Sequence, residues 1–392
     1  MQHIIHKSRA LFAAPLFLLT LATALFFSAI APGESATLIP DTPKIKAKGY
    51  LLIDFNSGRV LAEKESDQRL EPASITKMLS SYVFANELAK GSISLSDEVR
   101  ISEKAWRMQG SRMFVEVGKN VSVEDLLKGV IVQSGNDATV ALAEHIAGSE
   151  DAFASLMNQH AAELGMVDSH FVNSTGLPHK NHYTTPRDIA RLATALIRDF
   201  PEHYKQYSIR SFTFNNITQY NRNKLLWRNN TVDGIKTGHT DAAGYCLVAS
   251  ALRDDMRLIS VVLGTSSEES RAAESQKLLT YGFRFFETHK LYEANAPLTT
   301  ARIWKGTQEQ LELGLEQDLY LTIPKGQYKN LDANMNLDAR IVAPAKKGQS
   351  FGSVNISLSD EQYAKRELVA LTDIEKGGLV DSLIDEIKLL FE

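Results

Sequence analysis

Short strand-like segments stand at both ends of the first part of the chain, and this order constrains the fold most. Residues 50–54 and 60–62 have strand character and are joined by an Asn-Ser-Gly turn. Strand-like segments return at residues 233–238, 245–252 and 256–263. Helical patterns fill the stretch between the two groups. This order predicts an α/β domain, with the strands in one sheet and helices on both of its sides.

Helical periodicity marks the middle and the end of this domain. It covers residues 75–88, 123–131, 138–146, 150–164, 186–198 and 274–287. Lys90-Gly91 would stop the first helix, and Pro186 suits the first turn of the fifth. A polar loop at residues 170–184 separates the fourth helix from the fifth.

The predicted secondary structure changes near residue 290, from helices and strands to short strands alone. Short strand-like runs at residues 320–323, 339–342 and 368–371 alternate with turn residues. We therefore expect a first domain at residues 37–290 and a small, mostly β second domain at residues 291–375.

The two termini differ from these domains. In residues 1–36, the cations Lys7 and Arg9 precede an apolar run, as in a secretory signal peptide, and an uncleaved anchor is the alternative because the run is long. Residues 376–392 predict an amphipathic helix. Its apolar stripe consists of Leu379, Val380, Leu383, Ile384, Ile387, Leu390 and Phe391.

Composition excludes some classes of function. The 392 residues carry a net charge of −4, with lysine and arginine dispersed. No basic tract is present, so we expect no nucleic-acid partner. Cys246 is the single cysteine, so no internal disulfide can form, and we expect it to be a small buried residue.

A candidate nucleophile lies ahead of the first helical segment. Ser74 and Lys77 are three residues apart, and residues at i and i+3 share one face of a helix. A lysine in a dry site near other cations loses its proton near neutral pH and can then accept a hydroxyl proton. The S-x-x-K pattern alone is a weak signal.

A Ser-Gly-Asn turn between two helical segments supplies further polar groups. The hydroxyl of Ser134 could relay a proton to a leaving nitrogen, and the amide of Asn136 could hold a substrate amide. Taken singly, this pattern is an ordinary turn.

A strand-like run supplies the third group of residues. Lys236 and Thr237 could offer donors to a substrate carboxylate, and Gly238 would let substrate approach the strand backbone. The backbone N–H groups of His239 and Ser74 could form an oxyanion hole.

Together, S-x-x-K, S-x-N and K-T-G in this order mark penicillin-binding proteins and class A β-lactamases. From about residue 49 to its C-terminus, the chain resembles the D-alanyl-D-alanine carboxypeptidases, which are the low-molecular-mass penicillin-binding proteins. The resemblance also includes Gly135, residues 282–288 and the terminal amphipathic helix. It implies a penicillin-recognising domain with an antiparallel sheet between helices, followed by a β-rich domain.

The resemblance further implies a reaction, the removal of the terminal D-alanine from peptidoglycan pentapeptide stems, with a part in peptidoglycan maturation and cell shape. Ser74 would be the nucleophile and Lys77 the general base. Ser134 and Lys236 would assist proton transfer to the leaving D-alanine.

Recognition of the substrate is implied in the same way. Thr237 and Arg271 would bind the terminal carboxylate, because the arginine fork pairs with a carboxylate at two points. β-Lactams would acylate Ser74 as mimics of the substrate. No cofactor and no metal ion is expected.

Other classes of protein were weighed against this reading. A class A β-lactamase would need a Glu-x-x-Leu-Asn stretch between Asn136 and Lys236, and none is present. A zinc peptidase would need a third ligand beside His179 and His182. A transpeptidase, or a weakly active penicillin-binding scaffold of the cell wall, remains as an alternative.

The resemblance also implies a location, the periplasmic side of the inner membrane, with the C-terminal helix on the membrane surface. Residues 373–392 depart from this pattern, because their six acids and two bases should be repelled by anionic lipid. We expect anchoring by the apolar stripe, with packing against a partner helix as the alternative.

Overall fold

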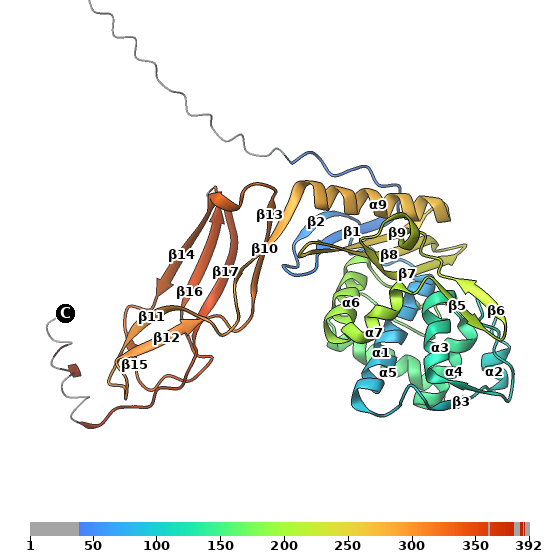
Figure 1. Ribbon diagram of the computed structural model, residues 1–392, viewed down its shortest axis with the longest axis horizontal. Coiled ribbons are helices and arrows are strands. Elements are labelled where there is room, and N and C mark those ends of the chain that lie inside the picture. Colours follow the sequence, from blue (N-terminus) through green and yellow to red (C-terminus); the bar gives the residue numbers. More distant parts are fainter. Residues whose placement is uncertain (1–38, 360, 380–384, 387, 389–392) are drawn as a thin grey trace, which may run out of the picture. The chain divides into compact units, whose positions relative to one another are not determined.

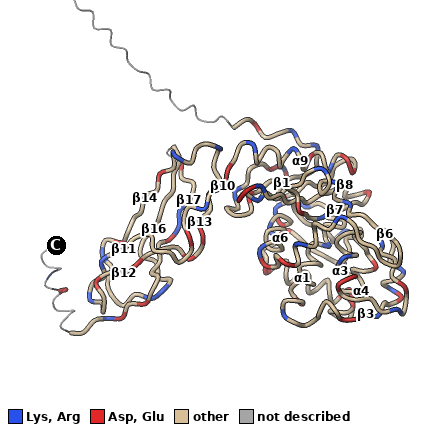
Figure 2. The backbone as a smooth tube through the Cα atoms, in the orientation of Figure 1, with Lys and Arg blue, Asp and Glu red and all other residues tan. Residues whose placement is uncertain are grey.

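A computed structural model describes residues 39–359, 361–379, 385, 386 and 388 (Figure 1). The expected signal peptide at residues 1–36 lies outside this part. Basic and acidic side chains are interspersed along the described chain (Figure 2).

One antiparallel sheet forms the centre of the first domain, with the strand order β2-β1-β9-β8-β7. Its strands are β1 (Gly49–Asp54), β2 (Val60–Lys64), β7 (Val232–Thr240), β8 (Gly244–Arg253) and β9 (Met256–Thr265). The first hairpin is hydrogen-bonded along β1 to β9, from Gly49 opposite Leu263 to Asp54 opposite Leu258. The two groups of strands predicted from the sequence therefore share one sheet.

Helices cover both faces of this sheet, as expected (Figure 1). Successive side chains of a strand point to opposite faces. Leu51 and Ile53 enter the core beneath the helices α1 (Lys77–Lys90) and α6 (Pro186–Asp199), whereas Leu52 enters the core beneath α9 (Glu268–Phe285). The continuously apolar β1 therefore serves two separate cores.

The remaining elements of this domain are shorter or differ from the predicted bounds. They are η1 (Ala73–Thr76), α2 (Glu103–Trp106), β3 (Glu98–Arg100), β4 (Asn120–Ser122), α3 (Val123–Lys128), η2 (Gly129–Gln133), α4 (Asn136–Ala147), α5 (Glu150–Glu163), α7 (Pro201–Tyr204), η3 (Lys205–Ser208), β5 (Ser211–Phe214), β6 (Ile217–Tyr220) and α8 (Leu225–Arg228). The helix expected at residues 123–131 gives way to a π turn at Gly129, and this turn ends at Ser134 with φ +64°.

The C-terminal part of the chain is mostly β, as expected. Its strands are β10 (Phe286–Tyr292), β11 (Pro297–Trp304), β12 (Gln310–Gly314), β13 (Leu319–Pro324), β14 (Leu331–Leu337), β15 (Ile341–Val342), β16 (Ser350–Leu358) and β17 (Glu361–Ala370), with a 3-10 turn η4 (Tyr328–Asn330). β10 pairs with β13, and the other six strands form a second sheet. The helix predicted at residues 274–287 ends at Phe285 and starts earlier, at Glu268, because Ser267 caps it by accepting the N–H of Ser270 at 3.0 Å.

The expected terminal amphipathic helix lies mostly outside the described residues. Of its described acids, Asp385 accepts the backbone N–H of Lys305 at 2.6 Å, and Glu386 accepts the ammonium of Lys305 at 2.6 Å. Within the described part of the chain, no helix has the length and apolar character needed to cross a membrane. Cys246 is a free, buried thiol on β8, and burial raises its pKa to about 11.

Gly282→Ala is expected to destabilise the protein, although alanine favours helices. A Cβ atom at residue 282 would lie 2.5 Å from Cδ1 of Leu258 and 3.2 Å from Cδ2 of Leu52. Overpacking of this kind costs about 1–3 kcal/mol, which outweighs the gain of about 1 kcal/mol in helix propensity. Thermal unfolding followed by circular dichroism should show a lower midpoint.

Ala273→Gly, at an exposed position of the same helix, is the matched control and should cost about 1 kcal/mol through propensity alone. A raised midpoint for Gly282→Ala would contradict the close packing of α9 on the sheet.

Candidate active site

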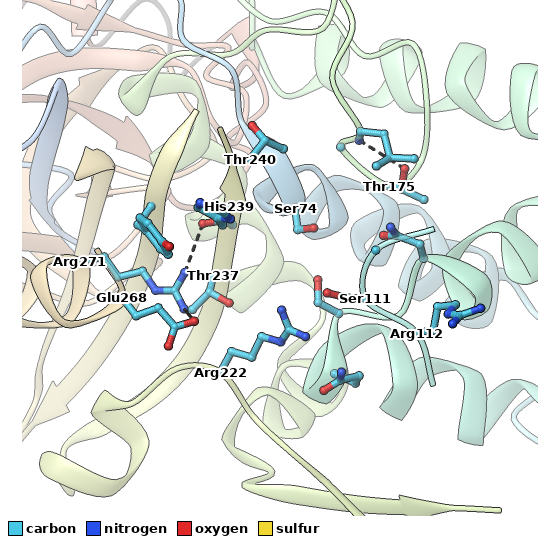
Figure 3. Close-up of a pocket in the computed structure, with 18 of the residues that line it drawn as sticks. Ser74, Ser111, Arg112, Thr175, Arg222, Thr237, His239, Thr240, Glu268 and Arg271 are labelled. Atoms are coloured by element: carbon cyan, nitrogen blue, oxygen red, sulfur yellow. Dashed lines mark hydrogen bonds and ion pairs between the residues drawn. The ribbon is translucent and has the colours of Figure 1, made fainter. Parts of the chain in front are cut away.

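A pocket of about 450 Å³ opens beside the edge strand β7 (Figure 3). Its walls come from the turn before α1, the segment before β4, the turn before α4, the polar loop, the segment before α8, the strands β7 and β8, and the start of α9. They include Ser74, Gly110, Ser111, Arg112, Phe114, Ser134, Asn136, Thr175, Gly176, Arg222, Thr237, Gly238, His239, Tyr245, Glu268 and Arg271.

Ser74 and Lys77 meet at the base of this pocket. Ser74 lies in the 3-10 turn η1, and Lys77 is the first residue of α1. The helix thus begins three residues later than the serine, but the tight turn still brings Lys77 Nζ to 3.1 Å from Ser74 Oγ.

The amine of Lys77 is buried and has two further partners. The side chain is 1% exposed. Its Nζ donates to Oδ1 of Asn136 at 2.6 Å and to the carbonyl of Thr175 at 2.7 Å. The orientation of the Asn136 amide is fixed, because its Nδ2 donates to the carbonyl of Gln109 at 2.6 Å.

This environment favours the neutral form of the lysine. Burial and the positive charge of Arg222 lower the pKa of Lys77 to about 7, against the attraction of Asp137 and Glu150. A neutral amine has two N–H bonds and one lone pair. Asn136 and Thr175 accept the two N–H bonds, so the lone pair is left to face the hydroxyl of Ser74.

A second buried lysine lies on β7. Lys236 is 3% exposed and donates to the carbonyl of Thr237 at 2.9 Å. Burial, followed by the charges of Lys77, Arg222 and Arg271, holds its pKa well below the usual range. The charge of Lys77 therefore disfavours protonation of Lys236.

Ser134 reaches the pocket in a left-handed conformation at the end of the π turn. Its Oγ is buried and has no hydrogen-bond partner among the described residues. The next residue, Gly135, leaves room for the carboxylate of Asp137. A Cβ atom at residue 135 would lie 2.9 Å from Oδ1 of Asp137. That carboxylate accepts the backbone N–H groups of Met113 and Phe114 at 3.0 and 2.9 Å.

β7 passes close to the turn that carries Ser74. A Cβ atom on Gly238 would lie 2.9 Å from the carbonyl oxygen of Pro72 and 3.1 Å from the nitrogen of Ile75. Glycine at this position lets the strand approach the turn. Thr237 and His239, on either side of it, line the same pocket as Ser74.

Arg271 lies on α9 at one side of the pocket. It is 3% exposed, so it is not a solvated residue of the helix start. Its guanidinium donates to the carbonyl of Gly238 at 3.3 Å and contacts Glu268 at 3.5 Å. Burial lowers its pKa.

The polar loop at residues 170–184 borders the site. Besides the carbonyl of Thr175, it contributes His182, which is buried rather than solvated. Nδ1 of His182 accepts the N–H of Val172 at 3.2 Å, so Nε2 carries the proton and donates to Oγ1 of Thr76 at 2.7 Å. Burial lowers the pKa of His182 to about 4, which keeps this link neutral.

Several pocket residues were missed by reasoning from the sequence. Arg222 had a usable signal, since the asparagines at 221 and 223 indicate a turn. Oδ1 of Asn221 accepts the N–H of Asn223 at 3.0 Å, and Oδ1 of Asn223 accepts that of Leu225 at 3.1 Å. Thr175 contributes only a backbone carbonyl, which no sequence pattern reveals.

The arrangement suits attack by an activated hydroxyl on an acyl group next to an anionic terminus. Ser74 contacts an amine whose pKa is lowered to about 7, and arginine side chains line the pocket. In the described part of the chain, no group of three or more His, Cys, Asp or Glu side chains could hold a metal ion.

Two family models match the chain. The model described as D-alanyl-D-alanine carboxypeptidase matches residues 36–267. The model described as the C-terminal domain of penicillin-binding protein 5 matches residues 286–376.

Characterised relatives agree with these matches. The chain is 46% identical over 363 residues to D-alanyl-D-alanine carboxypeptidase DacA of Escherichia coli K12, covering 91% of this chain and 90% of that relative. It is 37% identical over 348 residues to DacF of Bacillus subtilis, covering 86% and 88%.

Solved structures match as well. Penicillin-binding protein 5 of Haemophilus influenzae has a TM-score of 0.84 at 44% identity, covering 86% of this chain and 100% of that one. Penicillin-binding protein D2 of Listeria monocytogenes, in its ampicillin-bound form, has a TM-score of 0.58 at 27% identity, covering 62% and 100%. The chain belongs to the D-alanyl-D-alanine carboxypeptidase family.

Proposed function

We propose that this protein is a serine-type D-alanyl-D-alanine carboxypeptidase that shortens peptidoglycan pentapeptide stems through an acyl-enzyme on Ser74. The observation that carries the proposal is the 3.1 Å contact between Ser74 Oγ and the buried amine of Lys77. Family membership indicates the reaction and its substrate, and the geometry of the site indicates which groups carry out the catalytic steps.

Acylation begins when neutral Lys77 takes the proton of Ser74 as Oγ attacks the carbonyl carbon of the penultimate D-alanine. The N–H groups of Ser74 and His239 stabilise the oxyanion. The C–N bond breaks when the leaving nitrogen receives this proton through Ser134 and Lys236. D-Alanine departs and leaves an ester on Ser74.

The terminal carboxylate binds Thr237 and Arg271 in this scheme. Both line the pocket beside Ser74, and the buried guanidinium of Arg271 gains from an anionic partner. Asn136 and the backbone at Gly238 hold the stem peptide along β7.

Water completes the cycle by attacking the ester carbonyl, which releases the shortened stem and restores the hydroxyl of Ser74. β-Lactams acylate the same oxygen. The ampicillin-bound form of the Listeria relative supports this part of the proposal.

The proposed location is the periplasmic face of the inner membrane, after export by residues 1–36. The apolar stripe of residues 376–392 provides the attachment. Contacts of Asp385 and Glu386 with Lys305 offset two of the acids that would oppose an anionic surface.

Ser74→Ala should abolish D-alanine release from a synthetic pentapeptide, by at least about a thousandfold, because the nucleophile is lost. It should also prevent formation of a penicillin adduct, which mass spectrometry should locate on Ser74 in the unmodified protein. Ser155→Ala, which changes an exposed serine of α5, is the control. An adduct on another residue would overturn the mechanism, and labelling without D-alanine release would favour a scaffold.

Acylation by a fluorescent penicillin should become faster as the pH rises through about 7. Below that value the amine of Lys77 is protonated, so the rate should fall about tenfold per pH unit. Arg222→Gln removes a charge that lowers the pKa of Lys77, so its acid limb should move to higher pH. A rate that does not change between pH 5 and pH 9 would rule out Lys77 as the base.

Deletion of residues 377–392 should move the protein from the membrane to the soluble fraction of the cell, because the apolar stripe is removed. A high-salt wash of the intact protein should release little of it, since the attachment does not depend on charge. Unchanged fractionation after the deletion would count against the anchor.

A further inference from the structure

Arg112 is a second arginine at the pocket, and no role in the reaction above depends on it. Figure 3 shows Arg112 and Arg271 on opposite sides of Ser74. If Arg271 binds the terminal carboxylate, Arg112 lies on the side where the rest of a stem peptide continues.

The guanidinium of Arg112 is not paired with an acidic side chain of the described residues. No ion pair and no side-chain hydrogen bond joins it to another residue between 39 and 359 or elsewhere in the described chain, whereas Arg271 contacts Glu268. Its guanidinium carbon lies 5.2 Å from the centre of the Phe114 ring. An arginine on an aromatic face retains donors for a planar anion at its edge.

The backbone around Arg112 is fixed from three directions. The carbonyl of Ser111 accepts the N–H of Asn136 at 2.7 Å. The carbonyl of Arg112 accepts Nε2 of Gln219 at 2.9 Å. The next residue, Met113, donates its N–H to Asp137 at 3.0 Å.

Phe114 is held in an unfavourable conformation, with φ +68°. Aromatic residues rarely adopt this region, and such strain persists only where surrounding contacts impose it. Asp137 imposes it by accepting the N–H groups of Phe114 at 2.9 Å and of Val115 at 3.2 Å. The result is a ring placed at the pocket wall, beside the guanidinium of Arg112.

An anion is the ligand that this region favours. Arg112, Arg222 and Arg271 line the pocket, and Glu268 is the only acid in its lining among the described residues. Because Arg112 lies across Ser74 from Arg271, the residues upstream of the scissile bond are those on its side of the pocket.

We propose that Arg112 binds a carboxylate of the stem peptide upstream of its D-alanine pair, and that it makes the enzyme selective for acidic stems. This rests on the proposed function. Two positions could carry the carboxylate: the side chain of the third residue, or the free α-carboxylate of a γ-linked glutamate at the second.

The test compares acid and amide peptides of equal shape. One pair is acetyl-L-Glu-D-Ala-D-Ala and acetyl-L-Gln-D-Ala-D-Ala. The other is acetyl-γ-D-Glu-L-Ala-D-Ala-D-Ala and its α-amide. At low salt, kcat/KM should favour the acid of one pair about three- to tenfold, mainly through KM.

Arg112→Gln should bring that ratio close to one, and Arg112→Lys should give an intermediate ratio because a point charge remains. The ratio is taken within each variant, so an overall loss of activity does not obscure it. Arg253→Gln is the matched control, since Arg253 also lies over a phenylalanine ring but outside the pocket. It should keep the ratio of the unmodified protein.

Selectivity in the first pair alone assigns the carboxylate to the third residue, and selectivity in the second pair alone assigns it to the second residue. Equal rates for acid and amide in both pairs, or an acid preference that survives Arg112→Gln, would overturn the proposal. Peptide binding to Ser74→Ala, measured by calorimetry, reports the same preference without turnover. Absence of D-alanine release would therefore count against the proposed function, while the binding ratio still decides the role of Arg112.

Discussion

The site depends on how the amine of Lys77 is held. Removing an ammonium group from water is costly unless it is paired, and no carboxylate of the described residues contacts this one. The neutral amine, in contrast, is fully satisfied by the carbonyl of Thr175, the amide oxygen of Asn136 and the hydroxyl of Ser74. Three separate segments of the chain must converge on one nitrogen to provide these partners.

Glycine makes this convergence possible. A Cβ atom at Gly176 would overlap the carbonyl of Ala73, so the loop that carries Thr175 could not reach the turn of Ser74. Gly135 leaves room for the carboxylate of Asp137, and Gly238 lets β7 approach the same turn. Each glycine costs conformational entropy on folding, but its lack of a side chain allows the segments of the polar centre to pack closely.

The sequence predicted the sheet and the contact between Ser74 and Lys77 for physical reasons. The apolar run of β1 indicates burial on both faces, and a spacing of three residues from Ser74 to Lys77 gives contact in a 3-10 turn as well as in an α-helix. It could not predict Asp137 or the carbonyl of Thr175 as part of the site, because long-range backbone contacts place them there. The π turn before Ser134 was also hidden, since residues 123–131 have an uninterrupted helical pattern.

The pair of buried lysines explains how one site can both take and give a proton. The charge of Lys77 lowers the pKa of Lys236, and burial lowers the pKa of both lysines. In the proposed reaction, a substrate carboxylate bound by Thr237 and Arg271 would add a negative charge that favours protonation of the pair, which would help Lys77 accept the proton of Ser74. When D-alanine leaves with that carboxylate, the neutral amine is favoured again. The base is thereby restored at the step where water must be activated to attack the ester.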